Sequence, residues 1–407
     1  MMTYTEAYKK LERFDQLHVL KFYDELSPQE KEELLRQIDE TDFSVITSAK
    51  ASGSEKGAIS PISVLQLDGI EERRSSFEKT GAELIRQGKV GAVLLAGGMG
   101  TRLGSDNPKG MYNIGITREL FIFECLINNL LDVVRKVGAP IKLFIMTSDK
   151  NHEATVAFFN EKNYFGYDKA QVHFFMQDMA PATDFGGKVF METKSRMATS
   201  PNGNGGWFSS MKRGGLLTVI NEAGIEWLNV FAVDNVLQRI ADPCFIGAAA
   251  GGGYAVGSKV IKKASPDERV GVMCLEDGRP SIVEYYELSD EMRDQLDENG
   301  EPAYNYGVIL NYLFREKDLE ALAERTLPLH IVKKKINHID ADGNAVIPET
   351  ENGFKYENLV LDMINMLESC IPFEVVREHE FAPVKNRTGV DSVDSARELL
   401  KRNGVEL

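Results

Sequence analysis

The sequence predicts an α/β fold: a doubly wound, mostly parallel sheet, preceded by an N-terminal helical segment and followed by a small C-terminal α+β region. Two observations predict this fold. Short apolar runs at 90–95, 141–147, 172–177 and 227–233 are typical of strands, and helical stretches separate them. This alternation favours a parallel sheet, in which ligands bind beyond the carboxyl ends of the strands. The polar residues directly after these runs are therefore the candidate site residues.

Length and composition indicate two or three domains. The chain has 407 residues, of which 43% are apolar and 27% charged, which is ordinary for a globular protein. We expect a mostly helical segment at 1–87, a main α/β domain at 88–340 and a C-terminal region at 341–407. The net charge of −15 disfavours nucleic acid as a partner, although it leaves room for a locally basic pocket.

The cysteines and the N-terminus indicate a reduced, cytoplasmic protein. The four cysteines have no paired spacing, so neither a zinc site nor a disulfide framework is expected, and the histidines share no ligand spacing. The first ten residues lack the basic and apolar regions of a secretory signal. No run approaches the roughly 18 apolar residues of a membrane span, so no membrane partner is expected.

The N-terminal segment reads as helices as far as about residue 40. Ser27, Pro28 and Glu30 form a capping signature, with Ser at the cap and Glu three residues later. A loop rich in Ser, Gly and Ala is expected at 48–63, and a further helix at 71–87 that ends at Gly88. We assign no chemistry to this segment.

Helices are also expected between the strands of the main domain. One covers 120–137 and is closed by Gly138, Ala139 and Pro140. A second covers 151–159, and a third ends at 219–224. The connections are therefore of the strand–helix–strand type that a parallel sheet requires.

A glycine-rich loop follows the first strand of the main domain. Three glycines stand in four positions and two cations come after them, namely Gly97, Gly98, Gly100, Arg102 and Lys109. Glycines let the backbone approach a ligand closely, and exposed backbone N–H groups at a strand end form an anion site. A nucleoside triphosphate is the simplest ligand. A plain glycine-rich turn is the alternative, but a turn needs neither cation.

Two familiar phosphate-binding patterns do not match this loop. A P-loop needs Lys followed by Ser or Thr, whereas Lys109 is followed by Gly110. A dinucleotide fingerprint needs a third glycine where Leu103 stands, and Pro108 argues against an uninterrupted helix. A dinucleotide oxidoreductase is therefore the weaker enzyme hypothesis.

Three further positions carry candidate polar groups. Gln177 follows a strand and offers the donor and acceptor that a uracil edge needs, unless it is a solvated strand end. Asp234 follows another strand and suits Mg²⁺, which prefers a few carboxylates together with substrate phosphates, unless it caps a helix. Gly203 and Asn204 lie in a second glycine-rich loop at 201–206, for which a hairpin turn is the alternative.

The segment 95–104, LAGGMGTRLG, followed by PKGMY at 108–112, closely resembles the signature loop of the UDP-N-acetylhexosamine pyrophosphorylases, within the UDP-sugar pyrophosphorylase family. Further matches follow in order as far as about residue 400. They are PNGNGG at 201–206, VDN at 233–235, VGV at 270–272, VEY at 283–285, KKI at 334–336, NGFKYE at 352–357 and REHEFAPVKN at 377–386.

The resemblance implies a Rossmann-like nucleotidyltransferase sheet that turns UTP and a sugar-1-phosphate into a UDP-sugar and pyrophosphate. The sugar phosphate is already ionised and needs no general base, so positive charge and positioning are the main requirements. The resemblance implies that Asp234 holds Mg²⁺ and that Arg102, Lys109 and Lys385 neutralise the phosphates.

The resemblance also implies which residues hold the rest of the substrates. Those that position the uridine are Gly97, Gly98, Gln177 and Gly203, and those that orient the sugar are Asn204, Gly271 and Glu284.

One segment departs from the family pattern. Members that take N-acetylhexosamine have FNAGN, whereas this chain has YNYGV at 304–308. Val308 replaces an amide with an apolar branch, and Tyr306 replaces a small alanine. A lost hydrogen bond shifts substrate preference by a few kcal/mol. N-acetylglucosamine-1-phosphate, glucose-1-phosphate and galactose-1-phosphate therefore all stay open, as does a non-catalytic nucleotide-sugar binding or regulatory protein on the same fold.

Overall fold

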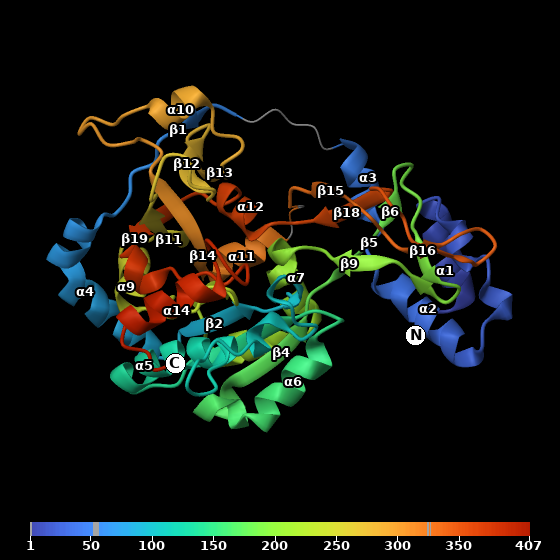
Figure 1. The fold of residues 1–407 in the computed structure, drawn as a ribbon, viewed down its shortest axis with the longest axis horizontal. Coiled ribbons are helices and arrows are strands. Elements are labelled where there is room, and N and C mark those ends of the chain that lie inside the picture. Colours follow the sequence, from blue (N-terminus) through green and yellow to red (C-terminus); the bar gives the residue numbers. More distant parts are fainter. Residues whose placement is uncertain (1, 52–56, 324, 326) are drawn as a thin grey trace. The chain divides into compact units, whose positions relative to one another are not determined.

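The computed structural model describes residues 2–51, 57–323, 325 and 327–407. By packing, the chain divides into two compact units, and each is assembled from three stretches of the sequence (Figure 1). The smaller unit consists of Met1–Glu55, Gln177–Trp207 and Thr326–Val360. The larger unit consists of Lys56–Met176, Phe208–Arg325 and Leu361–Leu407. The predicted domain boundaries at 87/88 and 340/341 divide the chain into three consecutive segments, and this division stays a prediction. Nowhere in the described ranges is a helix long and apolar enough to cross a membrane.

The larger unit is built on a sheet of ten strands within the described residues. Seven of them form a continuous path, in the order β1-β12-β14-β10-β2-β3-β4, while β13 pairs with β12, β11 with β14, and β19 with β11. The bounds are β1 Ile59–Ser60, β2 Val90–Leu95, β3 Lys142–Thr147, β4 Val172–Met176, β10 Trp227–Ala232, β11 Val256–Lys262, β12 Val272–Glu276, β13 Arg279–Val283, β14 Tyr306–Arg315 and β19 Cys370–Glu374.

The predicted parallel strands form one half of this sheet. Strands β10, β2, β3 and β4 are parallel neighbours, and each lies within a residue or two of its predicted position. All six residues of β2 are buried, as expected of a strand covered on both faces.

The other half corrects the prediction of a mostly parallel sheet, because the sheet is mixed. Strand β14 runs antiparallel to β10, β11 and β12. Strands β12 and β13 form a hairpin whose turn residues, Asp277 and Gly278, have φ values of 49° and 77°. Two successive positive φ values fit the tight turn that joins antiparallel strands. The prediction placed strands only as far as residue 233, so this half had no assigned pairing.

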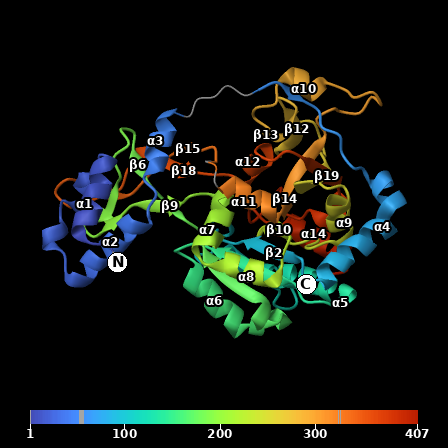
Figure 2. The same ribbon diagram turned by 180° about the vertical axis from the view of Figure 1, so that it is seen from behind.

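Helices cover both faces of the sheet. Helix α14 lies in front of it in Figure 1, and α7 and α8 lie in front of it in the opposite view of Figure 2. Helix α5 ends at Gly138, whose φ is 76°, as its predicted cap requires. The bounds are α4 Leu67–Arg86, α5 Ile122–Val137, α6 His152–Glu161, α7 Trp207–Arg213, α8 Leu216–Ala223, α9 Pro243–Gly251, α10 Asp290–Asp294, α11 Glu316–Ala323, α12 Val360–Asn365, α13 Arg377–Glu380 and α14 Val393–Arg402.

The smaller unit begins with helices α1 (Tyr4–Arg13), α2 (Pro28–Glu40) and α3 (Ser44–Ala51). The predicted capping box at Ser27 is present. Helix α3 occupies 48–51, where a loop was predicted, and residues 52–56 of that loop lie outside the described residues. The helices share a core with short strands, which are β5 Met179–Pro181, β6 Thr183–Asp184, β7 Met191–Thr193, β8 Arg196–Met197, β9 Thr199–Pro201, β15 His330–Lys334, β16 His338–Ile339, β17 Ala345–Val346 and β18 Gly353–Glu357.

The sheet topology brings distant chain segments to one edge of the larger unit. Strand β11 is antiparallel to β14, which is antiparallel to β10, so β10 and β11 run in the same direction. Strand β19 is parallel to β11. The carboxyl ends of β2, β10, β11 and β19 and the start of β14 therefore lie at the same edge.

Candidate functional site

The glycine-rich loop leaves the carboxyl end of β2 and closes on itself. The N–H of Gly100 donates to the carbonyl of Asn107 at 2.8 Å, and the N–H of Lys109 donates to the carbonyl of Gly98 at 3.1 Å. Gly98 is exposed, and a Cβ built on it meets no atom within 4 Å. The loop is thus fixed at its base, while its backbone at Gly98 faces open space that a ligand can enter.

A buried asparagine, Asn151, supports this loop from the connection between β3 and α6. Its side-chain Nδ2 donates to the carbonyl of Ala96 at 2.9 Å and to that of Gly98 at 3.4 Å. Its Oδ1 accepts from the N–H of Ser148 at 2.7 Å. The sequence pattern indicates only that Asn151 begins a helix. The signal that could have found it is its place just after β3, at the same edge as the loop.

Three of the predicted site residues, Asp234, Arg102 and Lys385, act electrostatically on a fourth, Lys109. Burial lowers the pKa of the Lys109 ammonium; Asp234 opposes this shift, and the cations Arg102 and Lys385 add to it. These influences come from the glycine loop, the end of β10 and the C-terminal segment, and the grouping of the four residues as one site stays a prediction. Their concentration of positive charge is unfavourable in the empty protein and suits a polyanion.

Asp234 and Lys385 are held side by side through their backbones. The N–H of Val384 donates to the carbonyl of Asp234 at 2.8 Å, and Asn235 and Pro383 form a β-bridge. The Lys385 ammonium donates to Asp391 Oδ2 at 3.0 Å and keeps a side-chain exposure of 41%. The ammonium is therefore anchored on one side and accessible to a ligand on the other.

The Asp234 carboxylate fits a divalent cation that is shared with a substrate. It is partly exposed, and no hydrogen bond or ion pair to its carboxylate is found among the described residues. The same residues contain no group of three or more His, Cys, Asp and Glu that could hold a metal ion. Such a site matches Mg²⁺, which keeps one or two protein carboxylates and takes its other ligands from phosphates and water.

Two of the three residues predicted to orient the sugar, Gly271 and Glu284, lie close together at the same edge of the sheet. A Cβ built on Gly271 would lie 3.6 Å from Val308 Cγ2 and 3.7 Å from Glu284 Oε1. The N–H of Val308 donates to the carbonyl of Gly271 at 2.9 Å. Because Trp227 pairs with Arg315 and β14 is antiparallel to β10, the start of β14 lies where β10 ends.

The remaining predicted residues belong to the smaller unit. Gln177 is buried and directly follows β4. Gly203 has a φ of 88°, and a Cβ built on it would lie 2.2 Å from the carbonyl oxygen of Asn358, so only glycine fits there. The Oδ1 of Asn204 accepts from the N–H of Val360 at 2.9 Å, which holds this loop on the start of α12. The loop therefore packs its backbone directly against Asn358 and does not form a hairpin turn, and its predicted contact with a ligand stays a prediction.

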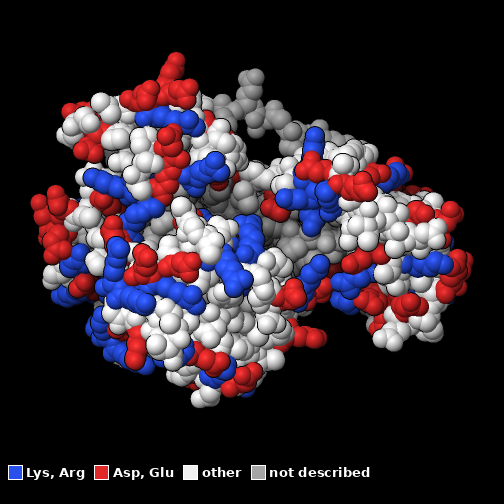
Figure 3. Space-filling view, in the orientation of Figure 1, with Lys and Arg blue, Asp and Glu red and all other residues white. Residues whose placement is uncertain are grey.

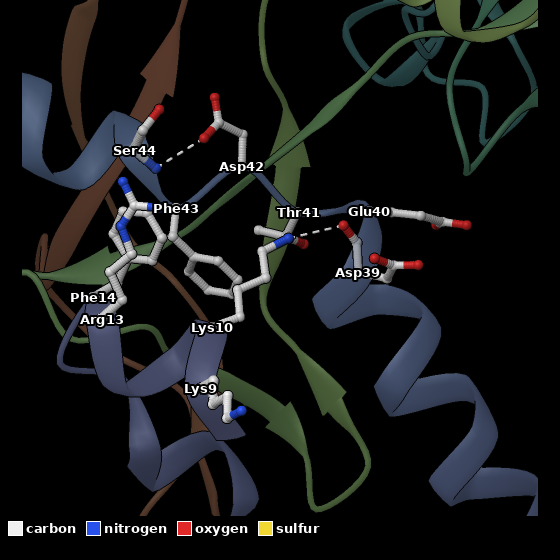
Figure 4. A pocket seen from close by; sticks show the side chains of 10 residues that line it. All are labelled: Lys9, Lys10, Arg13, Phe14, Asp39, Glu40, Thr41, Asp42, Phe43 and Ser44. Atoms are coloured by element: carbon white, nitrogen blue, oxygen red, sulfur yellow. Dashed lines mark hydrogen bonds between the residues drawn. The ribbon is translucent and has the colours of Figure 1, made fainter. Parts of the chain in front are cut away.

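The smaller unit also has a pocket of about 650 Å³ between α1 and the segment that joins α2 to α3 (Figure 4). Lys10 points across it and donates to the carbonyl of Asp39 at 2.8 Å. Phe14 and Phe43 stack beneath it with ring centroids 5.8 Å apart. The described lining residues include none that the sequence assigned to the site.

On the face shown in Figure 3, Lys and Arg side chains lie among Asp and Glu side chains.

Comparison with known proteins gives the family. The family model described as UTP–glucose-1-phosphate uridylyltransferase matches residues 42–403. The chain belongs to the UDP-sugar pyrophosphorylase family. A Mus musculus protein named UDP-N-acetylhexosamine pyrophosphorylase-like protein 1 is 35% identical over 409 residues, which cover 94% of this chain and 80% of the relative.

Two further relatives of this pyrophosphorylase-family chain carry names without the suffix "like". UDP-N-acetylglucosamine pyrophosphorylase of Saccharomyces cerevisiae is 36% identical over 360 residues, which cover 85% of this chain and 75% of the relative. The crystal structure of the Trypanosoma brucei uridine diphosphate N-acetylglucosamine pyrophosphorylase superposes with a TM-score of 0.84 at 27% identity, covering 98% of this chain and 85% of that one. The family predicted from the motifs is confirmed.

Proposed function

We propose that this protein is a UTP:sugar-1-phosphate uridylyltransferase. The observation that carries the proposal is that Arg102, Lys385 and Asp234 all act electrostatically on Lys109, while a backbone hydrogen bond from Val384 holds the Lys385 segment on Asp234. Two polyanions repel each other, and these residues offer the charge that lets them meet. Membership of the family supports the same reaction class.

The reaction is an in-line displacement at the α-phosphorus of UTP. A phosphate oxygen of the sugar-1-phosphate forms the new bond, and the bond from the α-phosphorus to the oxygen that bridges to the β-phosphate breaks. Pyrophosphate leaves with that oxygen. The attacking oxygen is already ionised, so the site needs orientation and charge stabilisation instead of a base.

We assign binding of the phosphates to the three cations and to Asp234. Arg102 and Lys109 come from the glycine loop and Lys385 from the C-terminal segment, so charge reaches the phosphates from separate parts of the chain. Asp234 is the residue that would hold Mg²⁺. When bound, Mg²⁺ neutralises charge on the phosphate oxygens.

We assign binding of the uridine and the sugar to the remaining predicted residues. We assign the uridine to the backbone of Gly97, Gly98 and Gly203 and to the amide of Gln177. The sugar takes Asn204, Gly271 and Glu284. Glu284 and Gly271 lie beside Val308, which supports a role of Val308 in choosing between N-acetylglucosamine-1-phosphate and glucose-1-phosphate.

The test is pyrophosphate release by the purified protein with Mg²⁺, UTP and a panel of sugar-1-phosphates. We expect release with at least one sugar-1-phosphate, and UTP to be used well ahead of ATP and dTTP. Binding of UTP without release from any member of the panel would favour the alternative, a non-catalytic nucleotide-sugar binding or regulatory protein. Equal use of ATP would remove the role given to Gln177.

A further inference from the structure

Lys259 of β11 carries a buried ammonium that the proposed reaction has not used. Its side chain is 0% exposed. The ammonium donates to Glu380 Oε2 at 2.5 Å, to the carbonyl of Arg239 at 3.0 Å and to Asp242 Oδ2 at 3.4 Å. All three N–H donors thus have acceptors, which is the condition for holding a charge in a protein interior.

The Lys259 contacts join β11 to two other stretches of the chain, residues 239–242 and the end of α13. Asp242 caps α9, Arg239 belongs to the turn after β10, and Glu380 ends α13. The ion pair between Lys259 and Glu380 spans 121 residues of sequence. It therefore fixes the C-terminal segment on the turn that follows β10.

Hydrogen bonds continue from Glu380 to the candidate site. Glu380 Oε2 also accepts from the N–H of Arg239 at 3.3 Å, and its backbone carbonyl accepts from Asn235 Nδ2 at 2.7 Å. Asn235 Oδ1 accepts from the N–H of Ala382 at 2.9 Å. The next step is the bond from Val384 to Asp234. Successive hydrogen bonds thus hold the segment from 380 to 384 against residues 234–239.

The ionic cluster is not explained by stability alone. Burial raises the pKa of the Glu380 carboxyl, although the Lys259 ammonium favours its charged form. For Asp242 burial also opposes ionisation, but Lys259 and Arg239 outweigh it and lower the pKa. Replacing a buried ion pair by apolar residues is often neutral or stabilising, so an orientation role fits this arrangement better.

We propose that Lys259 and Glu380 are positioning residues. Their ion pair sets the register of the 380–385 segment against residues 234–239, so that the Lys385 ammonium and the Asp234 carboxylate address the same phosphates. The inference rests on the proposed uridylyl transfer for its kinetic consequences. The coupling between the two segments itself does not depend on the reaction.

The first experiment is a double-mutant cycle with Lys259→Met, Lys385→Ala and the double variant. Pyrophosphate release is measured at a temperature at which circular dichroism shows each variant folded. We expect Lys259→Met to lower kcat about 10- to 100-fold, the usual cost of losing a group that orients a site residue, with a smaller change in KM. The double variant should be no slower than Lys385→Ala, because Lys259 acts through Lys385. Losses that multiply would overturn the proposal.

The matched control is Arg315→Met. It breaks the part-buried ion pair of Arg315 with Asp318 at the opposite end of β10, since Arg315 pairs with Trp227. It should lower the melting temperature and leave kcat near the wild-type value. A fall in kcat equal to that of Lys259→Met would show that loss of any ion pair suffices. Glu380→Gln, which keeps the shape and an acceptor, serves if Lys259→Met does not fold, and the same non-additivity is expected.

Hydrogen exchange separates failure of this proposal from failure of the proposed function. In the ligand-free protein, Lys259→Met should speed amide exchange at 381–386 and 234–238, and Arg315→Met should not. If the wild type releases no pyrophosphate but this exchange pattern holds, uridylyl transfer fails and the coupling stands. If exchange in both segments is unchanged, the coupling is wrong whatever the activity.

Discussion

The backbone N–H of Val384 donates to the carbonyl oxygen of Asp234 at 2.8 Å. This bond joins a segment near the C-terminus to the end of the central strand β10. This backbone hydrogen bond does not involve the side chain of Asp234 or Lys385, so replacing either side chain leaves the bond in place. Their roles can therefore be tested by substitution with the surrounding fold intact.

Asp234→Asn and Lys385→Ala should each lower turnover by about 100- to 1000-fold, the usual loss when one electrostatic contact to a charged transition state is removed. Circular dichroism should stay that of the wild type. Removing Mg²⁺ with EDTA should abolish pyrophosphate release by the wild type, and added Mg²⁺ should restore it. Wild-type turnover by either variant would refute the role given to that residue.

Lys109 should cost stability in the empty protein. Burial lowers its pKa, and Arg102 and Lys385 add to that shift against the pull of Asp234. Between the lowered pKa and the ordinary pKa of lysine, the unfolded chain binds more protons, so the contribution of Lys109 to the free energy of unfolding rises with pH across this window. Lys109→Met should therefore raise the melting temperature at neutral pH. It should also lack the rise in the free energy of unfolding with pH that Lys109 causes in the wild type.

The same Lys109→Met variant should bind UTP more weakly than the wild type. The control is Lys136→Met, because Lys136 lies exposed on α5 with an ion pair to Asp132. Thermal unfolding from neutral pH upward and UTP titration together check both effects. A variant that is less stable than the wild type at neutral pH would show that Lys109 is not under electrostatic strain.

Asn151→Ala should remove the support of the glycine loop. It leaves the carbonyl of Ala96 and the N–H of Ser148 without their side-chain partner, at a cost of about 1–3 kcal/mol in the free energy of unfolding. The KM for UTP should rise. Asn160→Ala, in the helix that follows Asn151, removes side-chain hydrogen bonds with Val156, Tyr164 and Lys169; it should leave the KM for UTP unchanged whatever it costs in stability. Chemical denaturation and initial rates measure stability and KM.

Val308→Asn should move sugar preference toward N-acetylglucosamine-1-phosphate. The amide restores a donor and acceptor beside Gly271 and Glu284, and one such hydrogen bond is worth about 10- to 100-fold in the ratio of kcat/KM values. Val308→Ala removes the apolar branch without adding the amide, so it separates size from hydrogen bonding. An unchanged ratio for both variants would place sugar choice elsewhere.

The sequence predicted the elements whose cause is local. Strands β2, β3, β4 and β10 are short apolar runs, and the glycine loop is recognisable from its own glycines and cations. The pairing of strands that lie far apart in the sequence could not be predicted from the local pattern. The antiparallel direction of β14 depends on the strands with which it pairs, and no strand was predicted beyond residue 233.

The supporting residues of the site were missed for the same reason. A lysine in a strand reads as solvated, and only its partner Glu380, 121 residues away, makes Lys259 a buried charge. Asn151 reads as a helix start, and its bonds to the carbonyls of Ala96 and Gly98 depend on two parallel strands lying side by side.

The long separation between the glycine loop and Lys385 bears on synthesis of the chain. A growing polypeptide on the ribosome carries its glycine loop well before Lys385 has been translated. On the proposed function, translation products that stop before residue 385 are expected to be inactive, because they lack both this cation and the segment that pairs with Asp234.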